Sequence, residues 1–445
     1  MSATGWNRVR EEAVGYLRDL IRFDTSNPPG NELPAAIFLR DILQREGIEA
    51  QIFESAPSRA NLIARLHGSG EARPMLLLSH LDVVPAKADE WYLPPFSGDI
   101  VDDHIWGRGA IDCKFLTIIQ LMTILLLHRQ CVSLKRDVIF AATADEEAGS
   151  KWGMGWLAVH HRDLLDCEYA INEGGGVGVA FGNKRYYICQ TAEKGICWLR
   201  IRAKGKAGHA SMPRDDNATA VLIRALEQLS RSRLEMRVTT TAKDFIETFA
   251  KEQGLHGFLL SRGLLNPRLF PVLLPRIIKE PTVARIVYAM LHDTATPTII
   301  KSGEIINVIP SIAEAQIDGR IVPGQTQDGF VNQIRRVVGD SIEIEVPFYA
   351  PGFEIPHDNE LFKVIRDVIA VEDPDARLVP FMLTAGTDSK YLAAAGVRVY
   401  GFAPMQQQAD ATVTEMIHGR DERIAVENVL FGTKVLYNIV KRFCA

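Results

Sequence analysis

Paired cysteines are missing from this chain of 445 residues. A secreted scaffold held by disulfides carries cysteines in recurring pairs, and the six cysteines here show no such spacing. They are Cys113, Cys131, Cys167, Cys189, Cys197 and Cys444. We therefore expect free thiols in a reducing compartment, and the cytoplasm is the predicted location.

An excess of positive charge is also missing. The formal net charge is −5, and no stretch of the chain is a basic run. Such a chain exerts no long-range attraction on nucleic acid or on an anionic membrane. The charge therefore argues against nucleic acid as a partner.

Long uninterrupted apolar runs are absent as well. The first residues lead into an amphipathic helix pattern through Val14, Leu17 and Leu20, without the apolar core of a signal peptide. Residues 115–127 are apolar, but they are too few and too often interrupted by polar residues to cross a bilayer. We expect a buried helix there, no membrane span and a soluble protein. The chain also shows no internal repeat and no low-complexity stretch.

What the chain does contain is a series of strand-like runs that end in histidine or acidic residues. Residues 75–79 form an apolar run that delivers His80 to its end, and Asp82 follows on the same side. A histidine that binds metal through one nitrogen needs the proton on the other nitrogen held in place. Asp82 is therefore predicted to orient His80 rather than to bind metal. Taken alone, this motif is more often a strand-end histidine beside a solvated aspartate.

Two further runs lead to carboxylates. Asp112 follows a loop with two glycines, where one carboxylate can approach and bridge two cations. The strand-like residues 138–143 run into Asp145, Glu146 and Glu147. Because adjacent side chains at a strand end diverge, we predict Glu147 as a metal ligand and Glu146 as the general base. The alternative is a solvated loop in which Asp145 caps a helix.

The last two candidate ligands are Glu173 and His418. Glu173 follows a strand-like run and precedes three glycines, and His418 precedes a final helix-like segment. Two divalent cations would be neutralised by three ligating carboxylates and one hydroxide, which suits a partly buried site. The hydroxide can exist near neutral pH because coordination lowers the pKa of bound water to ~7. The five candidate ligands, His80, Asp112, Glu147, Glu173 and His418, together predict a site for two metal ions.

In these motifs the chain resembles the di-zinc metallopeptidases that include aminoacylase, glutamate carboxypeptidase, succinyl-diaminopimelate desuccinylase and yeast carboxypeptidase S. The resemblance extends from about residue 17 to about residue 436. It implies two zinc ions per subunit, with cobalt or manganese as open alternatives. It also implies that His80 and Glu173 hold one ion, that Glu147 and His418 hold the other, that Asp112 bridges them, and that Glu146 is the base with Asp82 as orienter.

The chain departs from the family beside Asp112. The family usually has methionine and glycine where this chain has Cys113 and Phe115. The packing beneath the bridging carboxylate is therefore expected to differ. A small buried hydrophobic residue is the favoured interpretation of Cys113.

Other residues resemble the family's substrate contacts. His209, between a glycine and an alanine, can aim a donor at an oxyanion. The resemblance implies that it reaches the partner subunit's site in a homodimer, and the alternative is a turn histidine without a role. Arg320 and Asn307 resemble contacts to a substrate carboxylate, which an arginine fork binds in plane. Gly386 and Thr387 lie in a loop like the family's glycine-rich loop, although an ordinary turn would look the same.

The predicted fold is of the α/β class, with more than one core because the chain is long and 47% hydrophobic. Strand-like and helical patterns alternate as far as about residue 192, as in a mixed sheet between helices. An inserted α+β lid or dimerisation domain is expected at 194–321, with strands near 196–203 and 313–321. Candidate ligands lie on both sides of it. The di-zinc catalytic domain is therefore predicted to be discontinuous, formed by 1–193 and 322–445.

The predicted reaction is hydrolysis of an amide bond next to a free carboxylate, in an N-acyl amino acid or at a C-terminal peptide bond. The insert has apolar clusters between residues 258 and 274, which indicate either lid core or dimer interface, or an apolar lid for a fatty or aromatic acyl group. A dipeptidase or a carbamoyl-amide hydrolase remains an alternative. So does a non-catalytic binding protein, which would be expected to have lost ligands or the base.

Overall fold

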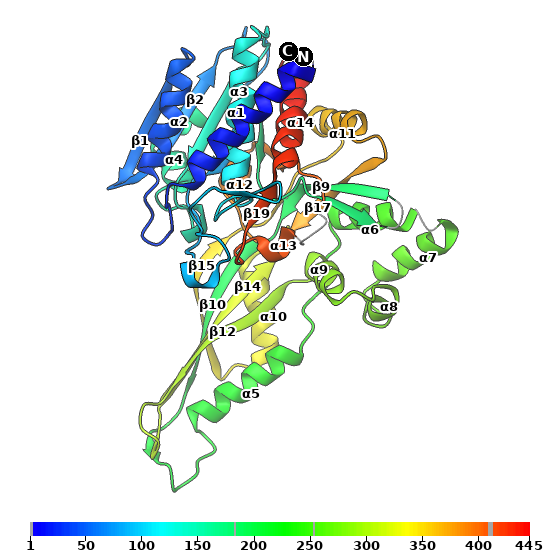
Figure 1. Ribbon diagram of the computed structural model, residues 1–445. Helices are drawn as coiled ribbons and strands as arrows, with labels where there is room; N and C mark the ends of the chain where they lie inside the picture. Colours follow the sequence, from blue (N-terminus) through cyan, green and yellow to red (C-terminus); the bar gives the residue numbers. More distant parts are fainter. Residues whose placement is uncertain (1–2, 182–183, 252–253, 408–412) are drawn as a thin grey trace. The chain divides into compact units, whose positions relative to one another are not determined.

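The chain folds into two compact units, which we describe separately. The computed structural model describes residues 3–181, 184–251, 254–407 and 413–445. Unit 1 comprises Met1–Gln190, Ile355–Val379 and Thr387–Ala445, and unit 2 comprises Thr191–Glu354 and Pro380–Gly386 (Figure 1). Among the described residues, we find no helix whose length and apolar character would let it span a bilayer.

Unit 1 is built around a large mixed sheet. Its strands are β1 (Ala50–Ala56), β2 (Arg59–Leu66), β3 (Met75–His80), β6 (Val138–Thr143), β7 (Tyr169–Asn172), β8 (Gly178–Phe181), β9 (Lys184–Glu193), β17 (Ala376–Leu383) and β18 (Arg398–Gly401). The order is β1-β2-β6-β3-β7-β18-β9, with β8 and β17 also paired to β9. The central strands β6, β3, β7 and β18 are parallel to one another. A smaller sheet contains β4 (Ile100–Val101), β5 (His104–Trp106) and β19 (Arg423–Ala425).

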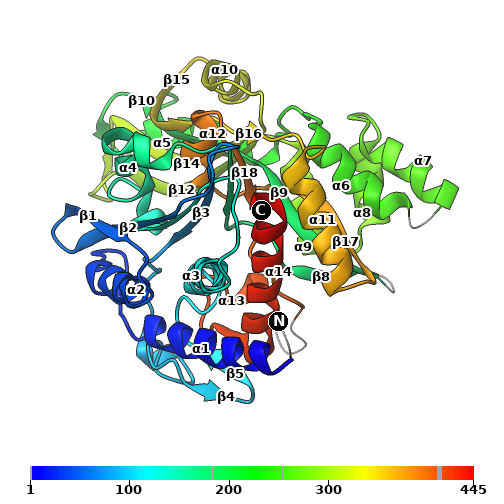
Figure 2. The same ribbon diagram turned by 90° about the horizontal axis from the view of Figure 1, so that it is seen from above.

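Helices cover both faces of the large sheet. They are α1 (Ala3–Ile21), α2 (Leu33–Arg45), α3 (Lys114–Arg129), α4 (Met154–His160), α11 (Glu360–Glu372), α12 (Ser389–Ala394), α13 (Val413–Met416) and α14 (Val426–Cys444), with short 3₁₀ turns η1 (Ala88–Glu90), η2 (Glu146–Ala148) and η3 (Arg162–Leu165). Helices α3 and α14 lie on one face, and α4 and α12 lie on the other (Figure 2). This arrangement confirms the predicted mixed sheet between helices.

Burial explains why residues 115–127 form a helix without being a membrane span. Helix α3 is buried along almost its whole length. Its polar residues bond within the core: Gln120 donates to the Leu78 carbonyl oxygen at 2.8 Å, and Thr123 donates to the Ile119 carbonyl oxygen at 2.8 Å. An apolar helix whose few polar side chains bond to the backbone is typical of the centre of a large domain.

The carboxyl ends of β3, β6 and β7 define the functional edge of unit 1. All three strands are buried over their entire length, as expected for parallel strands covered on both faces. His80 is the last residue of β3, the acidic triplet follows β6, and Glu173 follows β7. In open α/β sheets, ligands bind outside this edge.

Unit 2 contains a four-stranded antiparallel sheet of order β12-β14-β10-β15. The strands of this sheet are β10 (Gly195–Lys204), β12 (Thr294–Ser302), β14 (Ile312–Ile321) and β15 (Ile342–Ala350). Unit 2 also contains β11 (Gly208–His209) and β13 (Val308–Ile309), which pair with each other, and β16 (Phe353–Glu354), which pairs with the end of β9. Its helices are α5 (Ala218–Arg231), α6 (Thr240–Lys251), α7 (Gly254–Leu264), α8 (Phe270–Ile277), α9 (Pro281–Leu291) and α10 (Gln327–Val338). The two strands predicted near 196–203 and 313–321 are confirmed as β10 and β14. Buried residues alternate along β14, and they pack with α5 and α10 in one core.

Unit 2 extends beyond residue 321, where the inserted domain was expected to end. Strand β15 pairs with β10, and helix α10 packs into the same core. These elements complete the sheet of unit 2, which therefore continues to Glu354. The sequence offered no sign of this because α10 and β15 continue the alternation of helix and strand found in unit 1. The predicted domain limits themselves remain a prediction.

The apolar clusters of the insert divide between core and surface. Leu264 and Phe270 are buried in a core with Val287. Phe258 and Leu259 on α7 are exposed instead. The core interpretation therefore holds for part of this segment, whereas Phe258 and Leu259 contribute to an apolar surface.

Candidate metal centre

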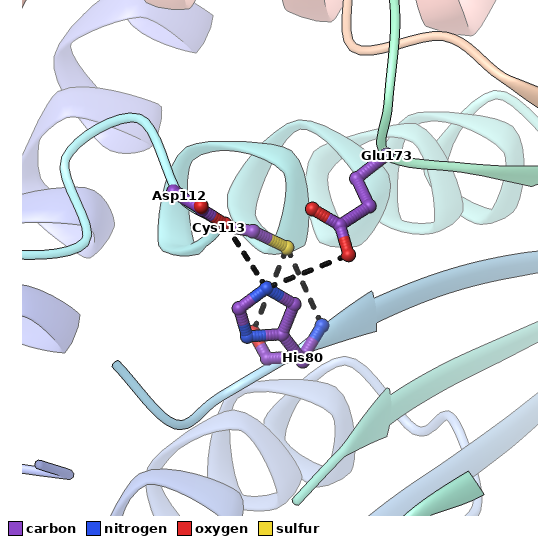
Figure 3. A group of neighbouring side chains, drawn as sticks. All are labelled: His80, Asp112, Cys113 and Glu173. Atoms are coloured by element: carbon purple, nitrogen blue, oxygen red, sulfur yellow. Dashed lines mark hydrogen bonds and ion pairs between the residues drawn. The ribbon is translucent and has the colours of Figure 1, made fainter. Parts of the chain in front are cut away.

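His80 faces two carboxylates at the carboxyl edge of the sheet of unit 1. Its Nε2 atom lies 3.1 Å from Oδ1 of Asp112 and 3.7 Å from Oε1 of Glu173 (Figure 3). Its Nδ1 atom lies 2.9 Å from the carbonyl oxygen of Asp82, to which it must donate. The proton of a neutral His80 is thus held on Nδ1, which leaves the lone pair of Nε2 directed at the carboxylates.

A second histidine, His418, lies close to the carboxylates of Glu147 and Asp112. Nε2 of His418 lies 3.0 Å from Oε2 of Glu147 and 3.3 Å from Oδ2 of Asp112. His418 follows α13, whereas Glu147 lies in η2 and Asp112 lies in the loop before α3. Three segments far apart in the sequence therefore converge on one point.

Asp112 belongs to both groups and presents one oxygen to each histidine. Burial alone would raise the pKa of its carboxyl group, but hydrogen bonds from His418 and His80 lower it below the ordinary value. The donor atoms of His80, Asp112, Cys113 and Glu173 lie within 4.8 Å of one another, and so do those of Asp112, Glu147 and His418. The five predicted ligands are thus brought together as two groups that share Asp112.

The charges of this cluster suit cations. Burial and the charges of Asp112 and Glu147 together raise the pKa of Glu173 to about 7, against the opposing effect of His80. Hydrogen bonds to Asp112 and Glu147 raise the pKa of His418 to about 10. A carboxylate whose pKa is raised in this way, such as Glu173, holds a proton that a bound cation would replace. Imidazole and carboxylate donors are ligands for zinc, cobalt and manganese.

Cys113 lies next to the first group but is bonded to the backbone. The N–H of His80 donates to its Sγ atom at 3.4 Å, and the thiol faces the carbonyl oxygen of His80 at 3.8 Å (Figure 3). Burial raises the pKa of the thiol to about 12, so it stays protonated. These contacts match the predicted small buried residue rather than a thiolate ligand.

Glu146 lies beside the cluster without belonging to either metal-binding group. Burial raises the pKa of its carboxyl group well above the ordinary value, and the negative charge of Glu173 raises it further. A carboxylate with a raised pKa can accept a proton near neutral pH and release it again. This is the property that a general base with a later acid role needs.

The carboxylate of Asp82 makes hydrogen bonds to residues other than His80. Its carboxylate accepts the backbone N–H of Glu146 at 3.0 Å and of Glu147 at 3.1 Å. The same carboxylate lies 3.5 Å from Nδ1 of His80, farther than the Asp82 carbonyl oxygen. The carbonyl group is therefore the closer orienter of His80, and the carboxylate positions the two glutamates that follow β6.

A buried polar network that contacts Asp82 carries no recognisable pattern in the sequence. Asn27 donates to both Asp82 and Asp145 at 2.9 Å, and Arg59 donates to Asp145 at 2.8 Å and pairs with the buried Glu32. The expectation that Asp145 caps the following turn is wrong, because its side chain makes no capping bond and is used in this network. Its backbone is left-handed, with φ of 66°. Nothing in the sequence around Asn27 or Arg59 distinguishes them from surface residues.

In unit 2, the structure brings His209 next to Asn307. Strand β11 pairs with β13, and the N–H of Ala210 donates to the Asn307 carbonyl oxygen at 3.0 Å. The N–H of Ser211 donates to Nδ1 of His209 at 3.2 Å. Since Nδ1 accepts this bond, a neutral His209 carries its proton on Nε2, where it is a donor. His209 lies in a short strand on the surface, not in a free turn.

Arg320 lies next to Gly386, also in unit 2. A β-carbon placed at Gly386 would be 3.8 Å from Nη1 of Arg320. The other nitrogens of the guanidinium group engage Asp318 at 2.8 and 3.1 Å. Nη1 is therefore the nitrogen directed toward the glycine-rich loop.

These two pairs stand at opposite ends of strand β14. Asn307 precedes the Ile312 end of the strand, and Arg320 lies at the other end. At about 3.4 Å per residue, they are separated by roughly 25 Å. A single copy of unit 2 does not bring all four predicted contacts into one place.

Thr387, in unit 1, is buried and bonded locally. Its Oγ1 atom accepts the N–H of Ser389 at 3.1 Å. The neighbouring Asp388 accepts from Thr143 at 3.2 Å and from Ser150. These contacts attach the loop to the end of β6, and they fit the interpretation of Thr387 as part of a local turn.

Comparison with known protein families gives a match over most of the chain. The profile of "Peptidase family M20/M25/M40" matches residues 76–442. The chain belongs to this peptidase family. The resemblance inferred from the five ligand motifs is thereby confirmed, and the chain is a metallopeptidase or amidohydrolase by family.

Several relatives have descriptive names. The chain is 29% identical over 383 residues to the "Probable carboxypeptidase S-like 2" of Dictyostelium discoideum, covering 83% of this chain and 71% of the relative. It is 26% identical over 380 residues to the human "N-fatty-acyl-amino acid synthase/hydrolase PM20D1", covering 83% and 74%. Its fold is similar to that of an M20 family metallo-carboxypeptidase from Sulfolobus solfataricus, with a TM-score of 0.70, 16% identity and coverage of 97% and 98%.

Proposed function

We propose that this chain hydrolyses an amide bond next to a free carboxylate, with two zinc ions bound per subunit. The observation that carries the proposal is the position of Asp112, whose two oxygens face His80 and His418 separately. A single carboxylate shared between two donor groups is what a two-metal hydrolase requires. Family membership supports the same conclusion.

In this proposal, His80 and Glu173 would hold one ion, Glu147 and His418 would hold the other, and Asp112 would be a ligand to both. Bound zinc supplies a Lewis acid and lowers the pKa of coordinated water to ~7. Asp82 keeps Glu146 and Glu147 in place through their backbone N–H groups.

Glu146 acts as the general base. Its raised pKa allows it to take a proton from the attacking water and then to pass that proton to the departing nitrogen. His209 stabilises the oxyanion by donating from Nε2, since its Nδ1 atom already accepts from Ser211.

The substrate is an N-acyl amino acid whose free carboxylate binds Arg320 and the loop at Gly386, with Asn307 of the partner subunit contributing at the same end of the substrate. The guanidinium group of Arg320 is held by Asp318, which leaves Nη1 toward Gly386. An apolar acyl group is favoured by the likeness to a fatty-acyl-amino acid hydrolase and by the exposed apolar residues of α7. The six unpaired cysteines support a cytoplasmic location.

Metal removal tests the reaction itself. The chelator-treated protein is expected to be inactive, and two equivalents of zinc should restore release of free amine from N-acyl amino acids, with cobalt and manganese compared in parallel. Long-chain acyl groups are expected to be cleaved faster than acetyl. A protein that keeps its activity without metal would contradict the proposal.

A matched pair of substrates tests the carboxylate requirement. The methyl ester of the same N-acyl amino acid is expected to react at least roughly 100-fold more slowly, because the arginine contact is then unpaired. Free dipeptides and N-carbamoyl amino acids belong in the same series. Preferred cleavage of either would assign the chain to one of those classes instead.

The separation of His209 from Arg320 supports a homodimer in which each subunit completes the site of its partner. Glu146→Gln and His209→Ala proteins are each expected to be nearly inactive. When they are mixed and allowed to exchange subunits, random pairing makes about a quarter of the sites complete, and activity should return. A mixture that stays as inactive as its components, although subunit exchange is verified, would mean that His209 serves its own subunit.

A further inference from the structure

Glu422 is a buried carboxylate that lies outside both groups of candidate ligands. Its side chain is fully buried. Oε1 accepts the backbone N–H groups of Ile111 at 2.7 Å and Asp112 at 3.0 Å. Oε2 accepts the N–H of Gly109 at 3.0 Å and Nη1 of Arg108 at 2.7 Å. One carboxylate thus holds the backbone of the whole loop that leads to Asp112.

Arg108 extends this contact to the segment that carries His418. Its Nη2 atom donates to the carbonyl oxygen of Gly419, the residue after His418, at 2.6 Å. Arg108 is itself buried. Glu422 belongs to the His418 segment and binds the Asp112 loop, while Arg108 belongs to the Asp112 loop and binds the His418 segment. The two contacts are reciprocal.

The His418 segment needs such support. His418 and Asp421 both have left-handed backbones, with φ of 60° and 58°. A residue other than glycine pays an energetic cost in this conformation, and it persists only where its surroundings hold it. The side chain of His418 is 52% exposed, so packing contributes little to its position.

We propose that Arg108 and Glu422 are positioning residues that set the distance between Asp112 and His418, and thereby the affinity of the metal site that these two residues share with Glu147. This inference rests on the proposed metal centre. Neither residue touches a metal or a substrate in this proposal. Their pairing aligns two ligands that come from segments more than 300 residues apart in the sequence.

Glu422→Gln tests the proposal. Glutamine has nearly the same shape, but its amide group cannot accept the N–H groups on one side of the loop. We expect zinc affinity, measured by competition with a chromophoric chelator, to fall about 10- to 100-fold, with the larger loss for one of the two ions. The absorption spectrum of the Co²⁺-loaded protein should change as well, because the geometry around His418 changes.

Arg108→Lys provides a second variant that is expected to fold. Lysine keeps the positive charge, but it cannot reach Glu422 and Gly419 together as the guanidinium fork does. We expect an intermediate loss of zinc affinity. Asp373→Asn is the matched control, because Asp373 is another buried carboxylate of unit 1, paired with Arg185 and Tyr187 and in contact with no candidate ligand among the described residues. It should lower the melting temperature without changing zinc affinity.

Two outcomes separate the inference from the proposed function. If Glu422→Gln and Arg108→Lys bind both ions as tightly as the unaltered protein, or lose no more affinity than Asp373→Asn, the positioning role is wrong and the metal centre stands. If the unaltered protein binds no zinc or cobalt at all, the proposed function fails first.

Discussion

Replacing Glu146 by glutamine is expected to abolish turnover while leaving the bound metal in place. Glutamine preserves the shape of the side chain but cannot take up the proton of the attacking water. General-base catalysis contributes about 10²- to 10⁴-fold, so kcat should fall by at least that range. Metal content should remain at two ions, since Glu146 lies outside both donor groups. The measurements are kcat with an N-acyl amino acid and metal analysis of the same sample.

The neighbouring residue is the control for this variant. Glu147→Gln alters the adjacent side chain of the same 3₁₀ turn, but Glu147 contacts His418. That variant should lose metal together with activity, whereas Glu146→Gln should lose activity alone. Near-normal turnover by Glu146→Gln would remove the assignment of the base. Loss of metal by Glu146→Gln would make Glu146 a ligand instead.

Replacing Asp112 by asparagine is expected to reduce the bound metal from two ions toward one. The asparagine amide retains one oxygen, but its nitrogen cannot act as a donor atom toward the second ion. Loss of a residue that only orients a ligand costs about 10- to 100-fold in affinity, and loss of a shared ligand should cost more. Activity should fall to that of the metal-free protein, because both histidines depend on Asp112. Metal titration and kcat provide the measurement.

Cys113→Ala is the control at the adjacent position. The thiol is buried and bonded to the backbone of His80, so its removal should leave two ions bound. A loss of one ion in this variant would mean that the sulfur is a ligand. If Asp112→Asn bound two ions with unchanged affinity, the shared-carboxylate arrangement would be wrong.

The residues of the candidate metal centre were largely predictable because most of them follow short apolar segments that can be recognised in the sequence. Each of His80, Glu147 and Glu173 follows an apolar run, and the runs proved to be neighbouring parallel strands. Parallel strands end at one edge, so residues placed after them converge without further information. The buried helix at residues 115–127 was predictable for a similar reason, since it is apolar but too short and too polar for a bilayer.

The supporting groups were not predictable. Arg59 and Asn27 bond to Asp145 and Asp82 from positions that carry no pattern of their own. Glu422 was visible in the segment after His418, but its burial and its bonds to the Asp112 loop depend on contacts across some 310 residues. The interpretation of Asp145 as a cap failed because a tertiary partner, Arg59, binds it instead.

The order and chemistry of the motifs were enough to predict the kind of donor atoms, the family and the discontinuity of the unit that holds them, because hydrophobic periodicity and residue type are properties of short segments. The spacing of the two donor groups, the role of the Asp82 carboxylate and the extent of unit 2 emerged only from the folded chain. Each of these depends on which distant segments pack together. That outcome is decided by burial and hydrogen-bond pairing over the whole chain, and no local pattern encodes it.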